Sequence, residues 1–173
     1  MSHVIWITGL SAAGKTTLAT AVTQRLRNQG RPVVMLDGDE LREALAVTDT
    51  HARDSRLVLA HKYARLARMI ARQGVTVVVG TVALFREIHA WNRENLPGYF
   101  EVYLRVPIDE LRRRDPKGIY RRFDAGEISD VAGLDLPVDE PVAPHLLIDY
   151  RPGVTPQAEL EMLLEKFNAF AAA

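Results

Sequence analysis

A glycine-rich segment directly after an apolar run constrains this chain more than any other feature. The run HVIWIT (residues 3–8) has the length and apolarity of a buried strand, and GLSAAGKTT (9–17) follows it without a linker. This segment fits the pattern G-x-x-x-x-G-K-[ST], in which backbone N–H groups turn inward around phosphate oxygens. A helical pattern follows, so the positive end of a helix points at the same anion. The segment therefore predicts a binding site for a nucleoside triphosphate.

Roles for single residues follow from the chemistry of this P-loop. Lys15 is expected to reach the β- and γ-phosphates, and the hydroxyl of Thr16 to bind the Mg²⁺ that accompanies ATP as a co-substrate. Glycines permit the close approach of the backbone to the phosphates. The predicted ATP-binding residues of the loop are Gly9, Leu10, Ser11, Ala12, Ala13, Gly14, Lys15, Thr16 and Thr17.

Strand-length apolar runs alternate with helical patterns along the chain. Several of the runs are apolar almost throughout, as is typical of parallel strands buried on both faces. Helical periodicity covers the stretches between them, at 14–30, 56–74 and 155–170. This alternation predicts an α/β fold, a three-layer α/β/α sandwich around a parallel five-stranded sheet, as one domain over 1–173. The predicted strands are 3–8, 32–37, 75–82, 99–106 and 145–150.

Residues 115–141 break this rhythm. The segment carries three glycines and three prolines without a strong period. An irregular stretch of this length is either disordered or functional. We interpret it as a lid over the phosphate site, and keep disorder as the alternative.

Composition excludes several classes of function. Lysine and arginine balance aspartate and glutamate at 22 each, which argues against a broad basic surface for nucleic acid. The chain has no cysteine, which excludes disulfides and thiolate zinc sites and favours the cytoplasm. The first residues lack the pattern of a signal peptide, and no apolar run approaches the ~18 residues of a membrane span. We therefore expect neither nucleic acid nor membrane as a partner.

Two carboxylates come directly after the second predicted strand, in the sequence VVMLDGDELR. The carboxyl edge of a parallel sheet is where ligands bind in such folds, so Asp37 and Asp39 should face the site. We assign Asp39 as the base that accepts a proton from an attacking hydroxyl, and Asp37 as a holder of the metal's water shell. The alternatives are the reverse assignment and a structural role for Asp39 as an N-cap of the following helix.

Four segments together resemble adenylyl-sulfate (APS) kinase: GLSAAGKTT, LDGDELR, RDPKGIY and GEISDVAGLDLP. The resemblance runs from Val4 to about Tyr150. It implies an ATP-dependent kinase that phosphorylates the ribose 3′-hydroxyl of a small nucleotide, adenylyl sulfate first of all. It also implies a homodimer with a lid that closes over both substrates.

The resemblance extends to single cationic residues. It implies that Arg42, Arg56 and Lys117 bind the acceptor together with Asp39, and that Arg114 at the base of the lid contacts ATP. Arg86 matches an arginine with both an acceptor-binding and a catalytic role. Such cations suit phosphoryl transfer, which depends on positioning and on neutralising spread negative charge.

The chain departs from the family pattern on the acceptor side. Leu59 stands where APS kinases carry an acceptor-binding asparagine, and Ala83 and Leu84 replace a serine and a proline. Val131, at an acceptor-binding position, replaces a phenylalanine that stacks on adenine. Such a stack is worth ~1–3 kcal/mol. The stretch FREIHAWNRENLPGYFEVYL resembles relatives that phosphorylate cytidine diphosphoramidate, which is therefore the alternative acceptor. An ATP-binding regulatory module without turnover is the alternative of another class.

Overall fold

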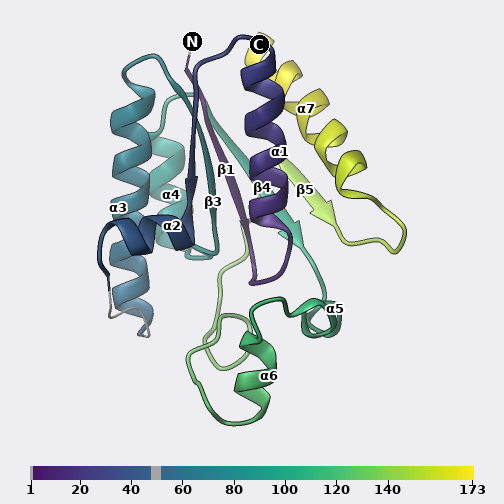
Figure 1. The fold of residues 1–173 in the computed structure, drawn as a ribbon. Helices are drawn as coiled ribbons and strands as arrows, with labels where there is room; N and C mark the ends of the chain where they lie inside the picture. Colours follow the sequence, from purple (N-terminus) through teal and green to yellow (C-terminus); the bar gives the residue numbers. More distant parts are fainter. Residues whose placement is uncertain (1, 48–51) are drawn as a thin grey trace.

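The computed structural model describes residues 2–47 and 52–173, and its strands form one parallel sheet (Figure 1). The strand order is β2-β3-β1-β4-β5, and each neighbouring pair runs parallel. Each strand falls within one of the five predicted runs or ends one residue beyond it, which confirms the predicted sheet. The strands are β1 (Val4–Gly9), β2 (Val33–Asp37), β3 (Thr76–Thr81), β4 (Tyr99–Arg105) and β5 (Leu146–Asp149).

Helices cover both faces of the sheet, which confirms the predicted three-layer sandwich. Figure 1 shows α1 and α7 on one side and α3 and α4 on the other. Helices α5 and α6 lie beyond the carboxyl ends of the strands. The helices are α1 (Lys15–Asn28), α2 (Gly38–Ala44), α3 (Arg53–Ala71), α4 (Arg86–Asn95), α5 (Ile108–Arg114), α6 (Ile119–Asp124) and α7 (Pro156–Ala172). No helix within the described ranges is both long and apolar enough to cross a membrane.

The central strand β1 shows why the apolar runs do not alternate. Ile5 and Ile7 belong to the core beneath α1 and α7, whereas Val4 and Trp6 belong to the core beneath α3. All four side chains are fully buried. Because successive strand residues point to opposite faces, a strand between two helical layers buries side chains on both faces, and Val4 to Ile7 are accordingly all apolar. β1 is thus held between the two helical layers, and the loop 9–17 begins at its carboxyl end.

The segment 115–141 has a defined conformation next to this edge. It contains α6 and a parallel bridge between Ala132 and Leu136. The hydroxyl of Tyr120 donates a hydrogen bond of 2.9 Å to the carbonyl of Ser11, so α6 contacts the glycine-rich loop directly. Of the two alternatives for this segment, the structure thus describes the folded one.

Candidate active site

A cavity of about 890 Å³ opens at the carboxyl edge of the sheet. Its size lies in the range typical of ligand sites. The glycine-rich loop forms one side, and α2, α3, the end of β3 and the segment 115–141 form the others. The loop 9–17 and the segment 115–141, which the sequence singled out separately, therefore share one site.

The glycine-rich loop is shaped for close contact with an anion. A Cβ atom at Gly9 would lie 2.7 Å from the carbonyl oxygen of Leu104, and Gly14 has a φ of 101°, so both positions favour glycine. The ammonium of Lys15 donates to the carbonyl of Leu10 at 2.7 Å. Residues 11–17 line the cavity, whereas Gly9 and Leu10 are not among its lining residues. Seven consecutive residues of the predicted ATP-binding loop thus form part of the cavity lining.

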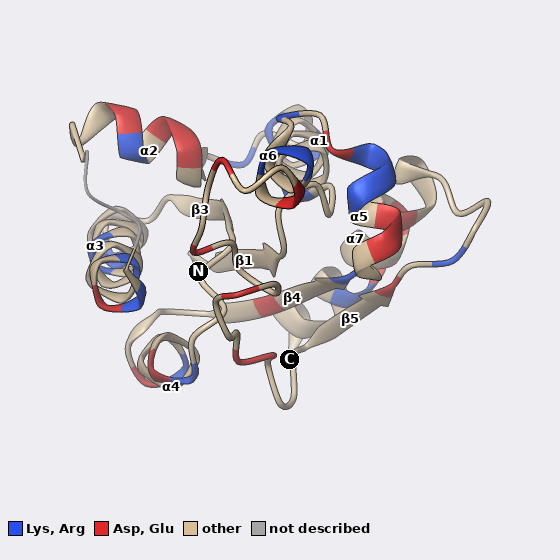
Figure 2. Ribbon diagram, turned by 90° about the horizontal axis from the view of Figure 1, so that it is seen from below, with Lys and Arg blue, Asp and Glu red and all other residues tan. Residues whose placement is uncertain are grey.

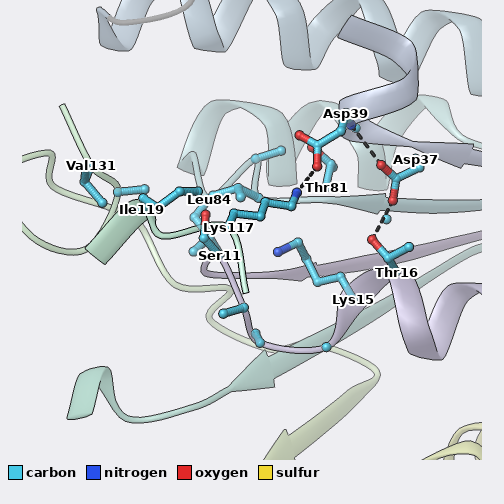
Figure 3. Close-up of a pocket in the computed structure, with 18 of the residues that line it drawn as sticks. Ser11, Lys15, Thr16, Asp37, Asp39, Thr81, Leu84, Lys117, Ile119 and Val131 are labelled. Atoms are coloured by element: carbon cyan, nitrogen blue, oxygen red, sulfur yellow. Dashed lines mark hydrogen bonds and ion pairs between the residues drawn. The ribbon is translucent and has the colours of Figure 1, made fainter. Parts of the chain in front are cut away.

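Asp37 connects the loop to the second acidic residue. Its Oδ2 accepts a hydrogen bond of 2.6 Å from the hydroxyl of Thr16, and its Oδ1 accepts one of 2.9 Å from the backbone N–H of Asp39 (Figure 3). Asp37 is therefore the N-cap of α2. The cap that we considered for Asp39 belongs to Asp37, because Asp39 already lies inside the first turn. Both aspartates line the cavity; Asp37 is buried, whereas Asp39 is exposed.

Asp39 lies between two cations from different parts of the chain. Its Oδ1 accepts a hydrogen bond of 2.5 Å from Arg42 on the same helix, and its Oδ2 pairs with the ammonium of Lys117 from the segment 115–141. Figure 3 shows Lys117 and Lys15 reaching toward the same space from opposite sides. Burial alone would raise the pKa of Asp39, but Lys117 and Arg42 outweigh it and hold this pKa below its usual value. The carboxylate is therefore ionised at neutral pH.

Lys15 has a perturbed pKa as well. Burial, and next the charge of Lys117, lower the pKa of Lys15 to about 8, although Asp39 and Asp37 partly oppose them. A lysine that is poised near neutral pH beside two carboxylates is typical of a functional site. Bound phosphates would add negative charge and favour the protonated form.

Most of the other predicted cations also reach the cavity. Arg42, Arg56, Arg114 and Lys117 all line it. Arg56 donates to the carbonyl of Asp130 at 2.6 Å, and Arg114 lies 3.5 Å from the carbonyl of Ala12 in the loop. Burial, and next the charge of Arg42, lower the pKa of Arg56. Four cations, from α2, α3, α5 and the segment 115–141, thus line one cavity.

Arg86 is the exception among the predicted cations. Its side chain is 84% exposed and its guanidinium lies 3.6 Å from the carboxylate of Asp139. It is not among the residues that line the cavity, although its chain neighbour Phe85 is. The structure therefore does not bring Arg86 to Lys15 and Asp39, and its catalytic role stays a prediction.

The departures from the family pattern all lie at the cavity. Leu59, Ala83, Leu84 and Val131 all line the cavity, and each is at most 6% exposed. We call these four residues the aliphatic wall. Leu59 comes from α3, Ala83 and Leu84 follow β3, and Val131 comes from the segment 115–141. The wall faces the ligand with side chains that neither donate nor accept hydrogen bonds.

Sequence reasoning missed Tyr63, which also lines the cavity. Its hydroxyl donates a hydrogen bond of 3.1 Å to the carbonyl of Gly38, the residue between the two aspartates. Burial raises the pKa of Tyr63, so the hydroxyl stays protonated and remains a donor. In the sequence, Tyr63 looks like one more core residue of a periodic helix. Its spacing of four from Leu59 is the one signal that placed both on the same face.

Charges of opposite sign meet across the site. Figure 2 shows blue lysine and arginine segments on α5 and α6 and red acidic segments at the start of α2. The start of α2 includes Asp39 and Glu40, and the last turns of α5 and α6 carry five arginines. The pair of Lys117 and Asp39 joins these two sides.

Comparisons with known proteins agree with this geometry. A family profile described as adenylylsulphate kinase matches residues 1–149. The chain is 36% identical over 164 residues to the cytidine diphosphoramidate kinase of Campylobacter jejuni, covering 95% of each chain. It is 38% identical over 149 residues to a probable adenylyl-sulfate kinase of Archaeoglobus fulgidus, covering 86% of this chain and 96% of that one.

One solved structure matches over nearly its full length. It is the APS kinase of Mycobacterium tuberculosis in complex with AMPPNP and APS. The TM-score is 0.89 at 28% identity, and the match covers 96% of this chain and 98% of the other.

Proposed function

This chain belongs to the adenylylsulphate kinase family and is a phosphotransferase, and from that premise we propose that it phosphorylates the ribose 3′-hydroxyl of a small nucleotide with ATP. The observation that carries the proposal is the position of Asp39. This carboxylate lies in the cavity, is ionised at neutral pH, and shares the cavity with Lys15 of the glycine-rich loop. A base and a phosphate-binding ammonium in one cavity are what transfer to a hydroxyl requires.

The donor half of the reaction rests on the loop. Its backbone N–H groups and the ammonium of Lys15 hold the β- and γ-phosphates, and α1 directs its positive end at them. Arg114, the last residue of α5, covers the nucleotide, because it lies next to the loop carbonyl of Ala12. These groups neutralise the charge that spreads over the transferred phosphoryl group.

Thr16 and Asp37 fit the Mg²⁺ that accompanies ATP. The hydroxyl of Thr16 donates its proton to Asp37, which leaves oxygen lone pairs of both groups for a hard cation. Thr16 would bind the ion and Asp37 its water shell. When bound, Mg²⁺ supplies charge neutralisation between the β- and γ-phosphates.

Asp39 takes the proton of the acceptor. As the 3′-oxygen forms its bond to the γ-phosphorus, the bond from that phosphorus to the bridging oxygen of ADP breaks, and the hydroxyl proton passes to Asp39. Arg42, Arg56 and Lys117 hold the anionic group of the acceptor, since all three line the same cavity. Arg86 is a further acceptor contact in this proposal, which requires its exposed side chain to turn toward the cavity.

Adenylyl sulfate is the first candidate for the acceptor, because several curated relatives are adenylyl-sulfate kinases or probable ones. Cytidine diphosphoramidate is the second candidate. The aliphatic wall favours it, since the wall lacks the aromatic ring and polar groups that the resemblance predicts for an adenine site. The Campylobacter jejuni relative, which also matches along 95% of both chains, adds to this argument.

A panel of nucleotides tests the proposal. The protein is incubated with Mg·ATP and each acceptor, and ADP release is followed with a coupled assay. Rapid turnover of adenylyl sulfate at micromolar concentration supports the first candidate. Turnover of cytidine diphosphoramidate alone would replace it with the second. Tight ATP binding with no turnover on any acceptor would favour a regulatory ATP-binding module.

A homodimer in solution, as the resemblance implies, is part of the proposal and is measured separately by light scattering.

A further inference from the structure

Helix α4 begins without a cap of its own. Its N-cap residue is Phe85, which has no side-chain oxygen, so no side chain at that position satisfies the first N–H groups. The backbone N–H of Arg86 instead donates to Oδ2 of Asp139 at 3.1 Å, from 53 residues further along the chain. A carboxylate in this place also complements the positive end of the helix. Asp139 thus supplies the cap of α4 from the segment 115–141.

The same carboxylate contacts α3. Nη2 of Arg53 lies 3.5 Å from Oδ2 of Asp139, and it donates to the carboxylate of Glu87 at 3.0 and 3.1 Å. The guanidinium of Arg53 also stacks over the ring of Phe85, with 5.3 Å to the ring centre. Because Arg53 begins α3 and Glu87 lies in the first turn of α4, Asp139 joins a network between the two helices.

The backbone of Asp139 is fixed as well. Its N–H donates to the carbonyl of Leu84 at 3.0 Å. The carboxylate is ionised at neutral pH, because the backbone N–H of Arg86, and then the charges of Arg86 and Arg53, hold the pKa of Asp139 below its usual value. These contacts attach the end of the segment 115–141 to the residues that follow β3.

The two segments that Asp139 joins, the end of the segment 115–141 and the residues that follow β3, both line the cavity. Leu136 and Val138, just before Asp139, line the cavity, and so do Ala83, Leu84 and Phe85 on the other side. The glycine-rich loop lies across the cavity, and within the described residues no hydrogen bond or ion pair joins it to Asp139. A change in the attachment should therefore move the aliphatic wall and leave the ATP loop in place.

We propose that Asp139 is a positioning residue for the acceptor: it fixes the segment 115–141 to the starts of α3 and α4 and so sets the spacing across the aliphatic wall. The inference rests on the proposed function, since it assigns this wall to the acceptor. It goes beyond the family resemblance, which implied no role for Asp139. It also gives Arg86 a structural role, because the backbone N–H of Arg86 donates one of the hydrogen bonds that hold Asp139.

The test compares Asp139→Ala and Asp139→Asn with the wild-type protein. Alanine removes every side-chain contact, whereas asparagine keeps an oxygen for the N–H of Arg86 and loses the charge. Asp124→Ala is the matched control. Asp124 lies in the same segment and accepts a hydrogen bond of 2.8 Å from Arg112, but it does not line the cavity. KM is measured for adenylyl sulfate, for cytidine diphosphoramidate and for ATP. Hydrogen exchange of residues 131–138 is measured on the unliganded proteins.

We expect Asp139→Ala to raise KM for the productive acceptor about tenfold, with KM for ATP within about twofold of wild type. Exchange in residues 131–138 should become faster, with Asp139→Asn intermediate and Asp124→Ala like wild type. An unchanged acceptor KM in an otherwise active Asp139→Ala protein would overturn the inference, and so would an equal rise in both KM values. If the wild type phosphorylates no acceptor, the proposed function fails, and exchange alone then decides whether Asp139 fixes the wall.

Discussion

The ammonium of Lys117 contacts the carboxylate of Asp39, although the two residues are 78 positions apart in the chain. Lys117 comes from the segment 115–141, whereas Asp39 lies in the first turn of α2. Both residues line the cavity, so their contact lies within the site. It also places a cation where it acts on the two groups whose ionisation matters for transfer, Asp39 and Lys15.

Replacing Lys117 by glutamine should move the acid limb of the pH–rate profile to higher pH. Lys117 helps to hold the pKa of Asp39 below its usual value, so its loss lets that pKa rise and the base form disappears at a higher pH. The profile of kcat/KM between about pH 4 and 7 measures the shift. Lys166→Gln, an exposed lysine on α7, is the control and should leave the limb in place. A limb that stays fixed in Lys117→Gln would show that Asp39 is not the group that titrates.

ATP binding should weaken as the pH rises through about 8. The pKa of Lys15 is lowered to about 8 in the unliganded protein, so the ammonium loses its proton above that pH and no longer attracts the phosphates. Titration calorimetry with an ATP analogue at several pH values follows this loss. In Lys117→Gln the weakening should begin at a higher pH, because the charge of Lys117 is one cause of the lowered pKa. Constant affinity from pH 7 to 9.5 would contradict this assignment.

Asp37→Asn should raise the Mg²⁺ concentration needed for half-maximal activity about tenfold, since the number of charged ligands tunes affinity for the ion. Asparagine is an equally good N-cap, so α2 and the melting temperature should change little. Activity as a function of Mg²⁺ at saturating ATP gives the half-maximal concentration. If Asp37→Asn needs no more Mg²⁺ than wild type, Asp37 does not hold the water shell of the ion.

Val131→Phe should favour adenine in the acceptor. Val131 belongs to the aliphatic wall, and a base–aromatic stack is worth ~1–3 kcal/mol, which corresponds to roughly ten- to a hundredfold in KM for adenylyl sulfate. Val138→Phe is the matched control, because Val138 is also a valine that lines the cavity but does not belong to the aliphatic wall. An unchanged KM for adenylyl sulfate in Val131→Phe would mean that the adenine does not lie against this wall.

Local patterns of the sequence predicted the sheet, the glycine-rich loop and the acidic pair. Each of these features is visible in residues that are close together in the chain. Val4 to Ile7 are apolar because the strand is buried on both faces. The end of each apolar run marks the carboxyl edge of the sheet, where the loop and the acidic pair lie. Alignment with the family singled out Leu59 and Val131, and both line the cavity.

Contacts between distant segments were not predictable in the same way. The cap of α4 comes from Asp139, and Tyr63 supports the turn between the two aspartates, yet neither residue belongs to a local pattern. Arg86 was predicted from its sequence position, but a position does not fix the direction of a long exposed side chain. Its guanidinium lies beside Asp139 rather than in the cavity.

The most direct test of the account is the transfer of labelled phosphate by wild type and by Asp39→Asn. Both proteins are mixed with Mg·ATP labelled at the γ-phosphorus and with the acceptor that the panel identifies, and the products of a single turnover are separated. We predict that wild type places the label on the 3′-oxygen of the nucleotide. Asp39→Asn should transfer at least about a hundredfold more slowly, while its affinity for ATP stays within about twofold. Equal transfer by both proteins, or label found only in free phosphate with the wild type, would contradict the account.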